Sequence, residues 1–175
     1  MTRPAPDRDA MTRLSVRARL DWMRWLALPV LAALAPAPAH AQQVAINSLA
    51  DVAFGTIANL SADVSNSQNV CVYSSTTRYS VKATGSGTSG AFTLSNGATA
   101  LPYEVQWAAS ANQTSGTALT AGTTLSGLTS SAGGQSCSLG FAPTVSLIIL
   151  LRGTNLAKTQ AGNYTGTLSL LISPN

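Results

Sequence analysis

The chain has 175 residues and a formal net charge of +4, but most of its charged residues lie near the N-terminus. Residues 42–175 contain four basic and three acidic side chains, a net charge of +1, and no histidine. Such a composition excludes the clustered lysine and arginine that a nucleic-acid surface needs. It also leaves no histidine for general acid–base or nucleophilic chemistry. We therefore expect a protein that is not an enzyme, binds no metal or other cofactor and does not bind nucleic acid.

The first 41 residues have the features of an export signal in the expected order. Basic residues precede an apolar run at 25–35, and small residues follow at 39–41. A membrane-spanning helix is the alternative, but it needs about 20 apolar residues, and this run is shorter and contains Pro29. We predict cleavage after Ala41, with no integral membrane anchor left. Residues 42–175 then form one exported domain.

The same sequence contains two internal methionines, Met11 and Met23, at which translation could begin instead of at residue 1. A start at either one changes the length of the leader and leaves residues 42–175 unchanged. The sequence does not distinguish between these starts.

Seven later segments have the alternating or apolar pattern of β-strands. In chain order they are 51–57, 69–74, 78–83, 91–95, 101–107, 143–152 and 164–172. The last of them places Tyr164, Leu168, Leu170 and Ile172 on one face, and Pro174 is expected to stop it. No window of the exported part has apolar residues at helical spacing. The pattern predicts an all-β sandwich.

Three details refine this prediction. Asn96-Gly97 has the composition of a hairpin turn between the strands around Leu94 and Leu101. Trp107 shares the apolar parity of its strand, which predicts a place in the core. Residues 145–151 are apolar at both parities, so they form either a strand covered on both faces or a strand beside an open apolar groove.

Two cysteines, Cys71 and Cys137, lie in the exported part. In an oxidising compartment a single disulfide between them is the default expectation. The chain-entropy model gives such a long loop about 4 kcal/mol of stabilisation. A redox or metal role is the alternative, but the chain has no CxxC pair, no histidine ligand after residue 41 and no cluster of acidic residues near either cysteine.

An ordered set of segments resembles the spore coat protein U domain, a family that includes subunits of archaic chaperone-usher pili. The set spans nearly all of the exported part. It consists of Phe54-Gly55, 70–75 (VCVYSS), 79–81 (YSV), 92–94 (FTL), 101–107 (LPYEVQW) and 161–168 (AGNYTGTL).

The resemblance implies an immunoglobulin-like β-sandwich that lacks its last strand and is completed by a strand donated from another subunit. It also implies a periplasmic chaperone, an outer-membrane usher and neighbouring fibre subunits as partners. The protein would pass through the periplasm to the cell surface or an extracellular fibre. Tyr164, Leu168, Leu170 and Ile172 match the position of the family's last strand, which borders the acceptor groove.

The N-terminus departs from the family pattern. Pilus shaft subunits usually carry a donor extension before their first core strand, whereas Phe54-Gly55 follows soon after residue 42. The apolar residues Val44, Ile46, Val52 and Phe54 share one parity, but Ser48 interrupts them. This segment is either a donor strand or the domain's own first strand.

Three classes of function remain for such a chain. The first is a structural subunit or accessory protein of a surface fibre, with a spore-coat-like structural role as a variant. The second is a tip-located binding module that uses the loops at 107–116 or 122–134, which are otherwise plain solvated turns. The third, a hydrolase, lacks a histidine base and a recognisable SxxK pair.

Overall fold

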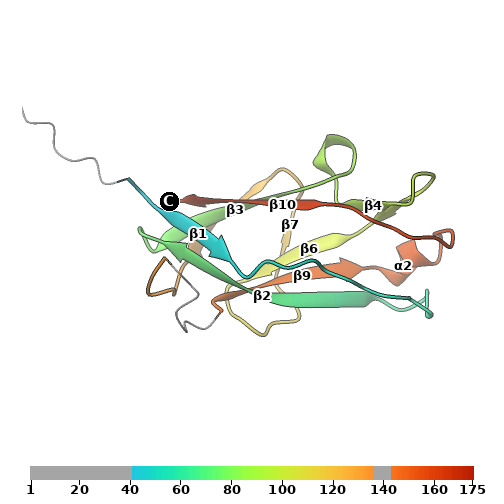
Figure 1. Ribbon diagram of the computed structural model, residues 1–175, viewed down its shortest axis with the longest axis horizontal. Helices are drawn as coiled ribbons and strands as arrows, with labels where there is room; N and C mark the ends of the chain where they lie inside the picture. Colours follow the sequence, from blue (N-terminus) through green and yellow to red (C-terminus); the bar gives the residue numbers. More distant parts are fainter. Residues whose placement is uncertain (1–40, 136–142) are drawn as a thin grey trace, which may run out of the picture. The chain divides into compact units, whose positions relative to one another are not determined.

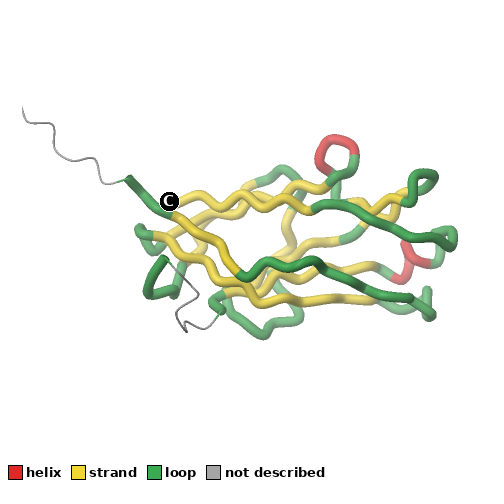
Figure 2. Tube along the Cα trace, viewed as in Figure 1, coloured by secondary structure: helices red, strands yellow, loops and turns green. Residues whose placement is uncertain are grey.

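A computed structural model describes residues 41–135 and 143–175 (Figure 1). Strands make up most of its regular structure, with helical turns at two places (Figure 2). The strands are β1 (Val44–Asn47), β2 (Val64–Ser74), β3 (Arg78–Gly85), β4 (Thr93–Ser95), β5 (Ala100–Pro102), β6 (Glu104–Ala108), β7 (Thr117–Leu119), β8 (Thr124–Thr129), β9 (Val145–Leu151) and β10 (Leu168–Pro174). The helical turns are the 3₁₀ turn η2 (Thr88–Gly90) and the single α-helical turn α2 (Gly153–Leu156).

These strands form two main antiparallel sheets and a separate hairpin. The larger sheet has the order β1-β2-β9-β6-β7, the smaller has the order β10-β3-β8, and β4 pairs with β5. An immunoglobulin sandwich has strands A, B, E and D in one sheet and C, F and G in the other. Here β1, β2, β9 and β6 correspond to A, B, E and D, and β3 and β10 correspond to C and F. The chain therefore has an all-β, immunoglobulin-like fold.

The core lies between the inner faces of the two sheets. Leu101, Tyr103, Val105 and Trp107 are all buried, which confirms the alternation predicted for 101–107, although the strand breaks at Tyr103 into β5 and β6. Trp107 is 1% exposed and donates its indole N–H to the hydroxyl of Tyr79 at 3.1 Å. The largest aromatic side chain of the core therefore has its polar atom satisfied by the opposite sheet.

The central strand β9 is buried on both faces. Its outer residue Ile148 is only 1% exposed and pairs in register with Ser67 of β2 and Gln106 of β6. Both neighbours bind the loop at 109–116: Ser67 donates to the carbonyl of Gln113 at 2.6 Å, and Gln106 accepts the N–H of Gly116 at 3.0 Å. This loop covers the outer face of β9, which explains why 145–151 is apolar at both parities. It confirms the interpretation of these residues as a strand covered on both faces.

The predicted hairpin at Asn96-Gly97 is confirmed. Leu94 of β4 pairs with Leu101 of β5. Gly97 has a φ of 90°, a conformation that glycine adopts without steric cost. The side-chain oxygen of Asn96 accepts the N–H groups of Ala98 and Thr99, so the asparagine itself closes the turn.

Two predicted strands and one predicted loop need correction. No strand forms at 51–57, where Gly55 adopts a φ of 64°. The last strand begins at Leu168 rather than at 164, and it ends at Pro174 as predicted. The predicted loop at 122–134 contains β8, whose Gly127 has a φ of 78° and whose pairing with β3 shifts register, so its period-2 pattern is broken.

We predict that Tyr79→Phe lowers the unfolding free energy by about 1–3 kcal/mol, because the buried indole N–H of Trp107 loses its acceptor. Chemical denaturation of residues 42–175 measures this loss. Tyr73→Phe is the matched control, since Tyr73 is only partly buried and its hydroxyl has no hydrogen bond to the described residues. Equal losses in the two variants would contradict the assignment.

Candidate functional site

One edge of β10 has no backbone partner among the described strands, because β10 ends its sheet and pairs only with β3. The N–H of Asn175 donates to the carbonyl of Arg78 on β3 at 3.2 Å. Backbone groups in an antiparallel strand point alternately to the two sides. Odd-numbered residues of β10 therefore bond to β3, and the backbone groups of Leu168, Leu170 and Ile172 point to the open edge.

Two further observations agree with this alternation. Ala83, the register partner of Leu170, directs its carbonyl away from β10 and accepts the N–H of Gly122 at 2.8 Å. Pro174 is even-numbered, so its nitrogen, which cannot donate, faces the open edge. Proline is tolerated in a strand at such a position, and β10 ends with it.

The open edge of β10 also borders the apolar core. Ile172 is 9% exposed, while Leu168 and Leu170 are half-buried and pack against the core cluster. The neighbouring Leu171 points to the other face and is 61% exposed. An unpaired strand edge beside partly exposed core side chains is the geometry that accepts an extended segment. We call Leu168, Leu170 and Ile172 with their backbone groups the acceptor edge.

The N-terminal segment lies near this edge in two parts. Val44 and Ile46 belong to β1, which pairs with β2 in the register Val44↔Ser74 and Ile46↔Val72, and β1 approaches β10 (Figure 1). At Ser48 the φ is 70°, and regular pairing ends. We call residues 48–58 the strap. Within it, three apolar side chains pack against the core while partly exposed: Val52, Phe54 and Ile57.

Two amides on β2, which sequence reasoning missed, hold the strap. Gln68 Oε1 accepts the N–H of Ala50 at 3.0 Å, and Asn66 Nδ2 donates to the carbonyl of Ala53 at 3.3 Å. Both pair in register with core residues of β9, so they occupy core-facing positions. Polar residues at the inward parity of an otherwise alternating strand are the signal that could have identified them.

An ion-pair cluster lies where the chain enters β2. Arg152 binds Glu104 through two nitrogens at 2.8 and 2.7 Å and Asp63 at 2.8 Å. Asp63 also accepts the N–H of Gly153 at 2.9 Å. This backbone bond, followed by Arg152, lowers the pKa of Asp63, and the Arg152 hydrogen bonds lower the pKa of Glu104. The cluster joins the end of β9 to the segment that follows the strap.

Tyr164, predicted to border a groove with the last strand, lies before β10. Its hydroxyl donates to the carbonyl of Gln160 at 2.9 Å and lies 2.6 Å from the hydroxyl of Thr99 and 3.1 Å from the amide of Asn96. The structure thus brings Leu168, Leu170 and Ile172 together in one strand and places Tyr164 against the β4–β5 hairpin.

The predicted disulfide involves a residue outside the described ranges. Cys71 is buried in β2 at 2% exposure. Cys137 falls in 136–142, which the structure does not describe. The pairing of the two cysteines stays a prediction.

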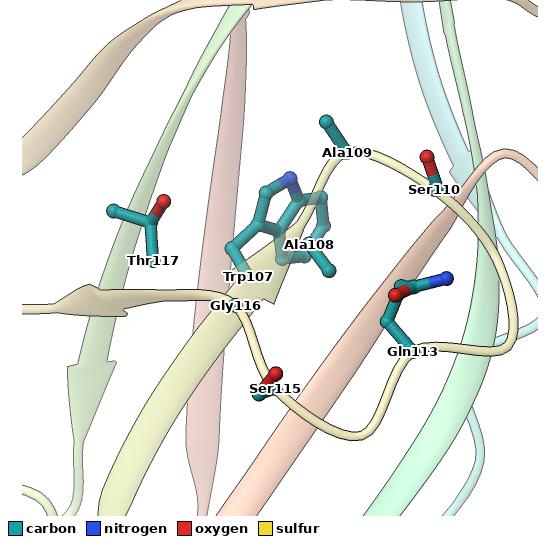
Figure 3. A pocket seen from close by; sticks show the side chains of 8 residues that line it. All are labelled: Trp107, Ala108, Ala109, Ser110, Gln113, Ser115, Gly116 and Thr117. Carbon is teal, nitrogen blue, oxygen red and sulfur yellow. The ribbon is translucent and has the colours of Figure 1, made fainter.

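A shallow hollow of about 340 Å³ lies over the loop that follows β6 (Figure 3). Its lining includes Trp107, Ser110, Gln113, Ser115 and Thr117. The loop is held firmly: the N–H of Gln113 donates to Ser146 at 3.0 Å, and Ser146 donates to the carbonyl of Ser110 at 3.0 Å. The hollow is neutral and polar, with small hydroxyl and amide side chains at its surface.

Within the described ranges, no three side chains of histidine, cysteine, aspartate or glutamate gather as they would around a metal ion. A search of the same residues finds no helix of the length and apolar character needed to cross a bilayer.

No family model and no curated protein matches this chain. A solved structure described as "Chaperone-tip adhesin complex is vital for synergistic activation of CFA/I fimbriae biogenesis" contains a similar chain, with 16% identity and a TM-score of 0.49. A second similar chain is in the CsuC–CsuE chaperone–tip adhesion subunit pre-assembly complex from the archaic chaperone-usher Csu pili of Acinetobacter baumannii, with 20% identity and a TM-score of 0.43.

These matches cover 77% and 75% of this chain but only 41% and 39% of the other chains. The present chain therefore spans about two fifths of the length of its structural neighbours. Both TM-scores are below 0.5. The immunoglobulin-like fold is defined by the pairing of this chain's own strands.

We predict that the ion-pair cluster makes stability sensitive to acid. The folded pKa values of Asp63 and Glu104 lie below their ordinary values of 3.8 and 4.5. Their contribution is therefore complete above those ordinary values and is lost as the pH falls through the lower folded ones. Arg152→Gln should lower the melting temperature at pH 7 by about 2–4 °C and flatten its decline below pH 4.5.

Thermal melts between pH 7 and pH 2 measure this effect. Lys158→Gln is the control, because it removes the same charge and Lys158 forms no ion pair with the described residues. An unchanged acid dependence in Arg152→Gln would show that the cluster does not couple stability to pH.

Proposed function

We propose that this protein is an exported, non-enzymatic structural subunit or accessory protein of a surface fibre of the chaperone-usher type, and that it assembles by accepting a donated β-strand. The observation that carries this proposal is the acceptor edge. It offers backbone groups at Leu168, Leu170 and Ile172 that have no partner among the described strands, and partly exposed core side chains at Leu168 and Leu170. Strand addition uses both features, the backbone for affinity and the side-chain pockets for specificity.

The topology supports the same proposal. In a complete immunoglobulin sandwich, strand G pairs with F. Here β10 takes the place of F, and no described strand pairs with its outer edge. A donated segment would take the place of G. Its alternate side chains would then fill the space above the half-buried Leu168 and Leu170.

The partners follow from this mode of assembly. An exposed apolar edge invites non-specific pairing in transit, so a periplasmic chaperone would supply a strand first, and an outer-membrane usher and neighbouring subunits would follow. The low charge of residues 42–175 gives little colloidal repulsion. Nucleic acid is not among the proposed partners, because the few basic residues do not form a stripe.

The N-terminal segment limits the place of this subunit in a fibre. Val44 and Ile46 are engaged in β1, within the domain's own sheet. Donation of these residues to another subunit would require β1 to leave β2. A terminal or accessory position, which needs no donation, is compatible with β1 as it stands.

A tip-located binding module is the second candidate. The observation that favours it is the polar hollow over 107–117, whose loop is fixed by Ser67 and Ser146. A preorganised loop loses little entropy when it binds. The same loop also covers Ile148, which is sufficient reason for its rigidity, so the fibre subunit remains the first candidate.

Hydrogen exchange of single backbone amides tests the strand-acceptor proposal. The exported protein is studied alone and with a peptide of alternating valine and threonine flanked by lysines. In the free protein, the amides of Leu168, Leu170 and Ile172 should exchange rapidly, while those of Ser169 and Leu171 are protected by β3. The peptide should slow exchange of the first group by at least about tenfold and leave the second group unchanged.

A peptide in which aspartate replaces valine is the matched control and should give no protection, because its side chains cannot enter the core. Protection of Leu168, Leu170 and Ile172 in the free protein would mean that the edge is already paired. Failure of the valine peptide to protect them would exclude strand acceptance at this edge.

A further inference from the structure

The strap is anchored firmly at both of its ends. Before it, β1 forms a regular ladder with β2. After it, Asp63 is bound by the N–H of Gly153 and by Arg152. Gly153 also permits close passage of the chain, since a Cβ atom there would lie 2.5 Å from the carbonyl oxygen of Ser61. Movement of the strap is therefore confined to the residues between these anchors.

The middle of the strap is held much less firmly. Its backbone forms no ladder with β2 or β10. Within the part of the chain that is described, its backbone bonds to the rest of the domain are those from Ala50 to Gln68 and from Asn66 to Ala53. Ser48 and Gly55 both have left-handed φ angles, which prevent a continuous strand.

The strap nevertheless covers part of the same apolar core that the acceptor edge borders. Val52, Phe54 and Ile57 pack, partly exposed, against the same core cluster as Leu168 and Leu170. Figure 1 shows the strap running between β2 and β10. A donated strand that pairs with the acceptor edge must place its alternate side chains against this cluster, where they compete with those of the strap.

We propose that the strap closes the strand-acceptor edge of the free subunit, that Asn66 and Gln68 hold it there, and that an incoming strand displaces it. This inference rests on the proposed function and adds its regulation. The incoming strand gains a regular ladder with β10, whereas the strap gives up two side-chain bonds. Until then the strap shields the core edge, which protects an open sheet from non-specific pairing.

The two amides allow a matched test, because each uses a different side of its amide group. Asn66 acts as a donor and Gln68 as an acceptor. Asn66→Asp removes the donor and places a carboxylate oxygen beside the carbonyl of Ala53. Gln68→Glu adds the same charge to the same strand but keeps an acceptor for the N–H of Ala50. Only the first variant should release the strap.

Chymotryptic cleavage after Phe54 in residues 42–175 reports the opening of the strap, and the masses of the fragments identify the cleavage site. When opening is fast compared with cleavage, the rate follows the open population. Asn66→Asp should raise this rate about 5- to 30-fold over wild type, and Gln68→Glu should stay within about twofold. Asn66→Leu, which also lacks a donor, should match Asn66→Asp, and Ser65→Ala, on the opposite face of β2, should match wild type.

The valine–threonine peptide supplies the second arm. At saturation it should raise cleavage after Phe54 in wild type to at least the rate of Asn66→Asp. Rates for Asn66→Asp and Asn66→Leu equal to that of wild type would overturn the role of the amides. If the peptide protects the amides of β10 but leaves cleavage after Phe54 unchanged, displacement is wrong and the proposed function stands. If it protects β10 in neither wild type nor Asn66→Asp, the proposed function fails as well.

Discussion

The structure depends on a constraint of every β-sheet, that backbone groups beside an apolar core need partners. In this sandwich the requirement is met on one side of β10 by β3. On the other side, the backbone groups of Leu168, Leu170 and Ile172 have no partner among the described strands, and the side chains of Leu168 and Leu170 are partly exposed. A polar edge in the same position would be satisfied by water. The combination of unpaired backbone and apolar side chains is the reason that we propose this edge as a site for another strand.

The remaining features form a rigid frame around this edge. Trp107 and Tyr79 join the two sheets through a buried hydrogen bond, and the loop at 109–116 buries the outer face of β9. Arg152 fixes the end of β9 to the entry of β2. Against this frame, the strap is held by two side-chain bonds. Stability is therefore unevenly distributed, with the weakly held segment lying where a partner strand would enter, as is usual for regions that respond to binding.

Much of this arrangement could be predicted from residue patterns. Alternation identified the strand around Trp107 and the core-facing parity of Leu168, Leu170 and Ile172, and Asn96-Gly97 identified the hairpin. The apolar pattern at 51–57 predicts a strand because Val52, Phe54 and Ile57 do pack against the core. The left-handed φ of Gly55 prevents the pairing. β8 was missed because Gly127 and its register shift break its period. The hydrogen bonds from Asn66 and Gln68 to the strap join segments that are far apart in sequence, and periodicity alone does not specify such contacts.

The central claim is that this domain is incomplete without a strand from a partner. Thermal unfolding of the exported protein, purified without partners and melted with and without the valine–threonine peptide, tests it most directly. We expect the protein alone to melt at a low temperature and the peptide to raise the melting temperature clearly, since a ligand that binds only the folded state stabilises it. A cooperative melt of the lone monomer that the peptide does not change would show that the sandwich is complete and would contradict strand acceptance.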